Sequence, residues 1–195
     1  MHKYIVGIDE AGRGPLAGPV TVAAAAAPIS NYKFLITKQL KRIKDSKKLS
    51  AKKREEWFSL FQSNPKILYT ISSVSHSVID KKGISYALRL AVKRCLEKLP
   101  LENRKAKVLL DGSLYAPPEY PQKTIIRGDE KIPIISAASI IAKVSRDQKM
   151  IRLSKKFPEY QFQAHKGYGT LLHRKLIKKH GLSEIHRKSY CTKLM

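Results

Sequence analysis

Acidic residues are scarce in this sequence of 195 residues. Asp and Glu together number 15 against 39 Lys and Arg, so the formal net charge is +24 at pH 7. Such an excess repels itself unless a polyanion lies nearby, and each basic side chain that faces a phosphate releases a counterion. The charge therefore predicts nucleic acid as the partner, but it does not separate an enzyme from a non-catalytic binding protein.

Cysteines and long apolar runs are equally scarce. Cys95 and Cys191 cannot form a disulfide framework, and no Cys/His spacing matches a zinc site. The longest apolar run, 22–28, is too short to cross a bilayer, and the N-terminus lacks the apolar core of a signal peptide. We therefore expect a cytoplasmic protein with reduced thiols and no membrane partner.

Short apolar segments alternate with amphipathic ones along the chain. The length, with 43% hydrophobic residues, suits a single domain over 1–195. The patterns predict strands at 4–8, 20–27, 67–74, 106–110 and 122–126, and helices at 51–61, 85–99, 136–156 and 170–179. This alternation predicts an α/β fold.

The few acidic residues gather at predicted strand ends. Asp9 and Glu10 follow the first strand, Asp111 follows another, and Asp129 comes after a third. Functional groups of α/β sheets collect at the carboxyl ends of strands, and clustered carboxylates need a cation such as Mg²⁺ or Mn²⁺. Each Asp alone could be an ordinary turn residue. Together, and within so basic a chain, they predict a metal-dependent nuclease.

The segment GRGPLA at 12–17 also matches a permissive dinucleotide-binding pattern. Pro15 and Pro19 disfavour the helix start that such a site needs, and no ribose-binding acid follows at the expected distance. The two acids before the glycines would repel a pyrophosphate. The dinucleotide interpretation is therefore disfavoured.

Seven sequence blocks resemble the ribonuclease HII family, the bacterial type 2 ribonucleases H. They are GIDEAGRGPLAGPV at 7–20, DSKKL at 45–49, LDG at 110–112, GD at 128–129, SAASIIAKVSRD at 136–147, HKGYGT at 165–170 and HRKSY at 186–190. The blocks follow the family order over essentially the whole chain. The DEAGRG form favours this family over ribonuclease HIII, and the departures are small, such as Tyr190 where Phe is common.

The resemblance implies an RNase H-like fold, with a mixed five-stranded sheet flanked by helices. A helical C-terminal part over 164–195 would grip the substrate. The implied activity is cleavage of the RNA strand of RNA–DNA hybrids and nicking 5′ of ribonucleotides embedded in duplex DNA, by a monomer, leaving a 5′-phosphate and a 3′-hydroxyl. Two divalent cations, Mn²⁺ or Mg²⁺, would be bound by Asp9, Glu10, Asp111 and Asp129.

The resemblance also implies the substrate contacts. Gly12, Arg13 and Gly14 would read the 2′-hydroxyl through a closely approaching backbone. Tyr168 would stack on the sugar beside the scissile bond, against the alternative of an ordinary buried tyrosine. The expected phosphate contacts are Lys47, Lys143, Arg146 and Lys166.

Other polar residues have simpler expected roles. Asp147 is interpreted as a structural or supporting residue. His165, His173, His180 and His186 fit no standard zinc spacing, so we expect surface or capping roles for them.

Two alternatives remain open. The first is a non-catalytic nucleic-acid-binding protein on the same fold, which would gain nothing from burying like charges beside a phosphate. The second is a related nuclease such as a resolvase, which would need a dimer surface that the sequence does not reveal.

Overall fold

The computed structural model describes residues 2–34, 40, 43, 49–101, 105–192 and 194. Its centre is a five-stranded sheet in the order β3-β2-β1-β4-β5. The strands are β1 (Tyr4–Ala11), β2 (Val20–Pro28), β3 (Leu68–Val74), β4 (Ala106–Asp111) and β5 (Gln122–Ile125). The pairs β1–β2 and β2–β3 are antiparallel, whereas β1–β4 and β4–β5 are parallel. The predicted mixed sheet is therefore confirmed.

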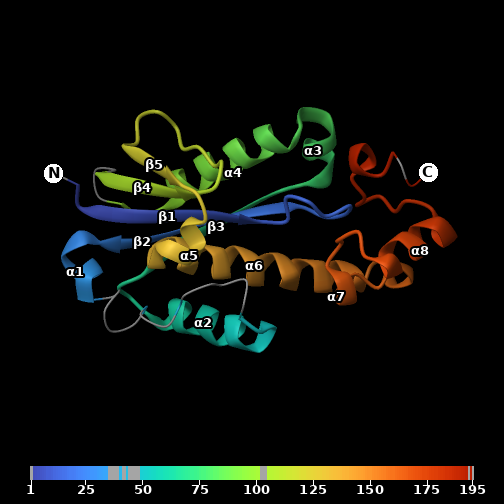
Figure 1. Cartoon of the computed structure of the whole chain (residues 1–195), viewed down its shortest axis with the longest axis horizontal. Coiled ribbons are helices and arrows are strands. Elements are labelled where there is room, and N and C mark those ends of the chain that lie inside the picture. The colour runs from blue at the N-terminus through green and yellow to red at the C-terminus, as the bar shows by residue number, and fades with distance from the viewer. Residues whose placement is uncertain are drawn as a thin grey trace.

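Helices cover both faces of this sheet (Figure 1). On one face lie α3 (His76–Lys82) and α4 (Ile84–Lys98); on the other, α6 (Pro133–Ser154) packs on the strands, with α2 (Ala51–Ser63) outside it. Short helices α1 (Ile29–Phe34) and α5 (Gly128–Lys131) follow strands. Beyond the end of α6 come η3 (Pro158–Tyr160), α7 (Phe162–His165), α8 (Leu171–His180) and η4 (Lys188–Tyr190), the last two within the C-terminal part.

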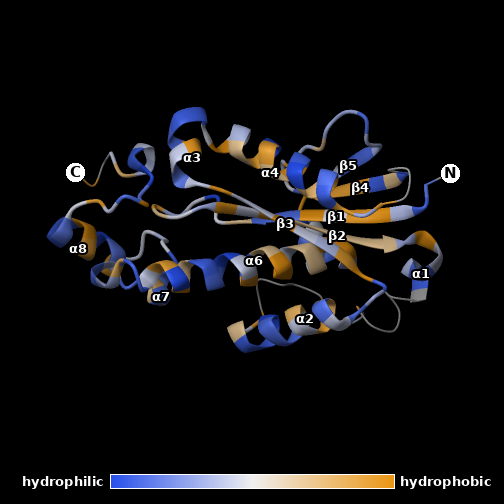
Figure 2. Cartoon of the chain, turned by 180° about the vertical axis from the view of Figure 1, so that it is seen from behind, coloured by the Kyte–Doolittle hydropathy of each residue, from blue (hydrophilic) through white to orange (hydrophobic). Residues whose placement is uncertain are grey.

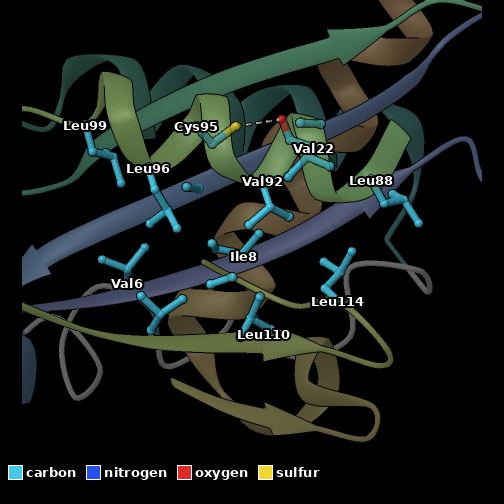
Figure 3. Packing of buried hydrophobic residues seen from close by; sticks show 14 of the residues in the cluster. Val6, Ile8, Val22, Leu88, Val92, Cys95, Leu96, Leu99, Leu110 and Leu114 are labelled. Carbon is cyan, nitrogen blue, oxygen red and sulfur yellow. Dashed lines mark hydrogen bonds between the residues drawn. The ribbon is translucent and has the colours of Figure 1, made fainter. Parts of the chain in front are cut away.

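The core on the α4 side is made of branched aliphatic residues. Figure 3 shows Val6 and Ile8 of β1 facing Val92 and Leu96 of α4. The Cys95 thiol donates a hydrogen bond to the Val22 carbonyl at 3.4 Å, and burial raises the pKa of this thiol to about 12. The cysteine thus acts as a small core residue in its reduced form.

The core on the α6 side depends on small residues. A Cβ atom at Gly7 would lie only 2.4 Å from the backbone of Ile134, so glycine lets the start of α6 lie directly on β1. Figure 2 shows hydrophobic colours on the half of α6 that follows α5 and hydrophilic colours toward α7. One half of α6 is therefore core, and the other half is free to carry polar side chains.

All of the predicted strands and helices are present, with ends shifted by a few residues. Asp9 and Glu10 lie inside β1 rather than beyond it, because β1 stays paired with β2 up to Ala11 and Thr21. None of the described helices has both the length and the apolar character needed to cross a membrane.

Candidate active site

A pocket of about 470 Å³ lies where β1 and β4 end. The pocket is lined by many of the predicted site residues, namely Asp9, Glu10, Gly12, Arg13, Gly14, Asp111, Lys143 and Tyr168. They come from β1, the loop after it, the end of β4, α6 and the segment after α7. The fold therefore gathers residues that lie far apart in the sequence.

The pocket begins where two strands end unevenly. Parallel pairing between β1 and β4 stops at Ile8 and Leu110, while β1 continues along β2. Asp9 and Asp111 are the next residues on the two strands. The carboxylates consequently meet at the edge that the sheet leaves open.

The carboxyl groups of Asp9 and Glu10 are held in an environment that opposes ionisation. Burial raises the pKa of Asp9 well above its usual range, and the neighbouring charges of Glu10 and Asp111 raise it further. A hydrogen bond with Ser139 acts in the opposite direction. Burial also raises the pKa of Glu10, against the lowering effect of Arg13, whose Nη1 lies 3.4 Å from Glu10 Oε1. A cation in the pocket would relieve this repulsion.

Asp129 sits beside the pocket without lining it. The Oδ1 atom of Asp111 accepts hydrogen bonds from the backbone N–H groups of Gly128, at 2.6 Å, and Asp129, at 3.4 Å. Asp129 itself is fully buried. Among the described residues, no three Asp, Glu, His or Cys side chains are gathered as a ready-made metal cluster. The predicted four-carboxylate set is thus brought together only in part.

Two buried arginines, Arg146 and Arg187, hold the loop after β1 by donating hydrogen bonds to its backbone carbonyls. Arg146 of α6 donates to the carbonyls of Pro19, Lys166 and Ala17 at 3.0, 3.0 and 3.3 Å. Its side chain is fully buried, and burial lowers its pKa to about 10. The structure therefore differs from the predicted phosphate contact, because the guanidinium of Arg146 is occupied by backbone carbonyls and shielded from solvent.

Arg187 completes this support from the C-terminal part. Its guanidinium donates to the carbonyls of Gly12, Arg13 and Gly18 at 2.6, 2.8 and 3.0 Å. Gly12 has a φ of +93°, and a Cβ atom there would lie 2.0 Å from Arg146. At Gly14, by contrast, a Cβ atom would meet nothing within 4 Å. The loop is therefore fixed on its protein side and open on its pocket side.

Tyr168 and Lys143 form the opposite wall of the pocket. The Tyr168 side chain is 38% exposed, which is inconsistent with the alternative of a buried tyrosine. The Lys143 Nζ lies 5.5 Å from the centre of its ring and 2.9 Å from Asp147 Oδ1. Asp147 thus orients Lys143, in line with its expected supporting role.

Of the other predicted lysine contacts, only Lys166 can be located in the described structure. Lys166 does not line the pocket, and its ammonium group donates to the Gln163 carbonyl. Lys47 lies outside the described residues.

Sequence reasoning missed three residues at this site: Ser139 and Arg54, which line the pocket, and Arg187 beneath the loop. Ser139 and Arg187 belong to sequence blocks noted above, so those blocks were a usable signal for them. No sequence signal distinguishes Arg54 from the other basic residues around it.

A second cluster of titratable groups lies in the C-terminal part. His165, His173 and His186 are buried, and the rings of His165 and His173 stack with centres 4.1 Å apart. Burial lowers the pKa of both His173 and His186 to about 4. Of the expected surface or capping roles, the surface role is wrong for these three, whose rings hydrogen-bond to backbone groups of nearby turns, whereas His180 is exposed.

The hydrogen bonds of this cluster define neutral rings. The N–H of Ser183 donates to Nδ1 of His186 at 2.9 Å, so the proton of His186 lies on Nε2 and is donated to Nε2 of His173 at 3.0 Å. The proton of His173 then lies on Nδ1 and is donated to the Tyr168 carbonyl at 2.9 Å. Nε2–H of His165 donates to the Tyr160 carbonyl, and its Nδ1 accepts from Gly167. The cluster therefore supports the backbone that carries Tyr168.

Comparison with known proteins identifies the family. The family model described as Ribonuclease HII matches residues 6–193. A ribonuclease HII of Caldicellulosiruptor bescii is 42% identical over 194 residues, covering 100% of this chain and 89% of that protein.

Two solved structures have the same fold. The ribonuclease H2 of Pyrococcus horikoshii OT3 has a TM-score of 0.76 and 27% identity, and the alignment covers 98% of this chain and 96% of the other. The ribonuclease HII of Archaeoglobus fulgidus, solved in a complex with PCNA, has a TM-score of 0.76 and 28% identity, covering 97% and 96%. With a family model matched over nearly its whole length, the chain belongs to the ribonuclease HII family of ribonucleases H.

Proposed function

We propose that the protein is an endonuclease that cleaves the RNA strand of RNA–DNA hybrids and nicks duplex DNA on the 5′ side of embedded ribonucleotides. The observation that carries this proposal is the pocket of Asp9, Glu10 and Asp111 inside a chain of net charge +24. A pure binding protein would be weakened by carboxylates at the place where phosphate lies, whereas a hydrolase needs them.

The donor set fits hard divalent cations, Mg²⁺ or Mn²⁺. Carboxylate oxygens are the ligands that these ions prefer. Burial, with the charges of neighbouring carboxylates, raises the pKa values of Asp9 and Glu10, and a bound cation would favour their ionised forms. Asp9, Glu10 and Asp111 would hold the ions, with Asp129 joining them after a local rearrangement. When bound, two divalent cations would supply an activated water and stabilise the leaving oxygen, so that hydrolysis leaves a 5′-phosphate and a 3′-hydroxyl.

The other pocket residues would position the substrate. The open side of Gly14 leaves room for a sugar against the backbone of the loop, where its 2′-hydroxyl can be read. Arg13 and Lys143 offer positive charge at the pocket wall for phosphates. The exposed ring of Tyr168 is suited to stacking on the neighbouring sugar.

The C-terminal part, residues 164–195, would grip the substrate by holding these groups in place. Arg187 fixes the loop of Gly12 and Arg13, and His173 fixes the backbone of Tyr168. Both sides of the pocket thus depend on this part. Because all these groups come from one chain, the proposal needs only a monomer.

Cleavage of a labelled DNA duplex that contains one ribonucleotide tests the proposal. We expect one nick on the 5′ side of the ribonucleotide with Mg²⁺ or Mn²⁺, none with EDTA, and none in the matched all-DNA duplex. The new 3′ end should be extendable by a DNA polymerase. Binding of the duplex without a nick under either metal would favour the non-catalytic alternative instead.

A further inference from the structure

A preformed groove of about 480 Å³ lies outside the catalytic pocket, where the loop that joins β4 to β5 passes beside α4 (Figure 1). Tyr86, Arg89 and Lys93 of α4 form one wall, and Tyr115 and Pro118 of the loop form the other. The proposed function does not use this groove.

The wall on α4 is the face that the sheet does not cover. Residues 86, 89, 90 and 93 follow helical spacing along one stripe, whereas Leu88, Val92 and Leu96 face the core (Figure 3). Tyr86 is 44% exposed and Tyr115 is 55% exposed. Among the described side chains, the exposed aromatic ones are these two and Tyr168 of the catalytic pocket. Exposed aromatic rings beside cationic side chains are the composition of a surface on which nucleobases stack.

The loop wall is rigid before any ligand arrives. The side-chain amide of Gln122 accepts from the N–H of Ala116 and donates to its carbonyl, both at 2.9 Å. Leu114, Ala116 and Tyr120 are buried and anchor the loop in the core. A preformed groove binds at a lower entropic cost than one that must open first.

A smaller hollow lies between the groove and the catalytic pocket. This hollow of about 270 Å³ shares Arg89 and Tyr115 with the groove and shares Arg13 with the pocket. Arg13 Nη2 donates to Ser113 Oγ at 3.0 Å, which ties the loop after Asp111 to the loop after Glu10. Shared cationic and aromatic residues therefore link the catalytic pocket to the groove.

We propose that this groove binds an unpaired strand of nucleic acid adjacent to the cut site, with bases stacked on Tyr115 and Tyr86 and phosphates facing Arg89 and Lys93. Among the described residues, none that lines the groove carries a carboxylate, and the ion pair of Lys93 with Glu97 at 3.8 Å is exposed and weak. Unpaired bases expose ring faces that are stacked inside a duplex. These apolar faces suit a groove that is also lined by Leu90, Ala116 and Pro118. The inference rests on the proposed function, because it places the groove next to the scissile bond.

The test compares two ligands for the D9N variant, whose binding can be measured without cleavage. One is a short blunt duplex with a single ribonucleotide, and the other is the same duplex with an oligothymidine overhang, made in turn on each side of the ribonucleotide. By fluorescence anisotropy, Y86A/Y115A added to D9N should lose about tenfold in affinity for one overhang ligand and nothing for the blunt duplex. Y86F/Y115F should retain the affinity, because the stacking rings remain.

The charge contribution has its own readout. R89A/K93A should lower the salt slope of overhang binding by about 1.4, as expected for two lost single-strand phosphate contacts. The matched control K155A/K156A removes two exposed lysines at the far end of α6 and should leave the slope unchanged.

Equal affinities of Y86A/Y115A and its parent for both overhang ligands would overturn the proposal, as would equal losses for blunt and overhang ligands. Failure of the proposed function is distinguishable from this, since it would appear as a lack of metal-dependent cleavage of the blunt duplex by the wild-type protein.

Discussion

Two clusters in this molecule consist of residue types that commonly ligate metals, carboxylates in one and histidines in the other, and they differ in what surrounds them. Burial and the neighbouring carboxylates raise the pKa of Asp9, and burial raises the pKa of Glu10. Burial lowers the pKa values of His165, His173 and His186, and each of the six ring nitrogens of these three residues has a hydrogen-bond partner. Residue types that can ligate a metal therefore indicate a metal site only where hydrogen bonds within the protein do not already satisfy their polar atoms or balance their charge.

Tyr168 connects the two clusters. Its ring lines the carboxylate pocket, while its carbonyl accepts the hydrogen bond from His173. One cluster is thus suited to chemistry with an external cation, and the other to holding a substrate-facing residue in position.

The largest effect is expected at the carboxylates. D9N or D111N should reduce cleavage of the ribonucleotide-containing duplex by at least about 10³-fold, because each removes a ligand charge from the metal site. Affinity for the duplex should stay the same or increase, since repulsion of phosphate falls. Single-turnover cleavage and anisotropy measure the two quantities, and a joint loss of cleavage and binding would contradict the assignment.

The next largest effect is expected from the histidine cluster, on stability. H173A removes a buried ring with two hydrogen bonds, so we expect a loss of about 3 kcal/mol in the free energy of unfolding, or a fall in Tm of roughly 6–12 °C. The exposed His180 gives the control H180A, expected to change stability by less than about 0.5 kcal/mol. Similar Tm values for H173A and H180A would mean that the cluster does not support the fold.

Metal linkage should distinguish the clusters directly. Mn²⁺ at a hundredfold excess over its Kd should stabilise the wild-type protein by about 2.7 kcal/mol. D9N should raise the metal-free Tm, because it removes like charge, and should abolish most of the increase due to Mn²⁺. H173A should retain that increase in full. If the increase in Tm caused by Mn²⁺ were lost in H173A and kept in D9N, the histidines rather than the carboxylates would be the metal site.

Acid should give the smallest effect, with opposite signs at the two clusters. His173 and His186 have a lower pKa in the folded state, so the unfolded chain binds more protons; their stabilisation is complete above about pH 6.5 and is lost as pH falls toward 4. Asp9 and Glu10 have raised pKa values, so their ionisation costs stability as pH rises. We expect Tm to fall by a few degrees from pH 7 to pH 5, and to fall more steeply in D9N.

Ring NMR signals provide the site-specific check. His173 and His186 should titrate with midpoints near 4. Midpoints near the ordinary value of about 6.5 would show that the rings are solvated and that the cluster is not closed.

The sequence was most informative where a local pattern determines the structure. Apolar blocks located the strands, and Ser50 and Thr170 cap α2 and α8 through hydrogen bonds with Lys53 and His173 backbone N–H groups. Short elements such as α3 and α5 were not predicted, because one or two turns carry too little periodicity. The acids at strand ends were recognisable for the same local reason.

Long-range contacts account for what the sequence could not predict. Arg146 and Lys143 are both basic residues on one helix, yet Arg146 is buried against carbonyls of residues 17 and 19 and Lys143 faces the pocket. Composition cannot predict which of the two residues is buried, since this depends on which loop packs over that turn of α6. The neutral state of the histidines is equally a product of partners from different segments.

The hydrogen bonds from Arg187 to the loop after β1 also bear on the order of folding during synthesis. The carbonyl of Arg13 and the guanidinium that binds it are separated by 174 positions. A chain that emerges from the ribosome N-terminus first can form β1 and β2 early, but its loop has no final support until the segment around Arg187 emerges. The active-site loop is therefore among the last parts of the nascent chain to gain its final hydrogen bonds.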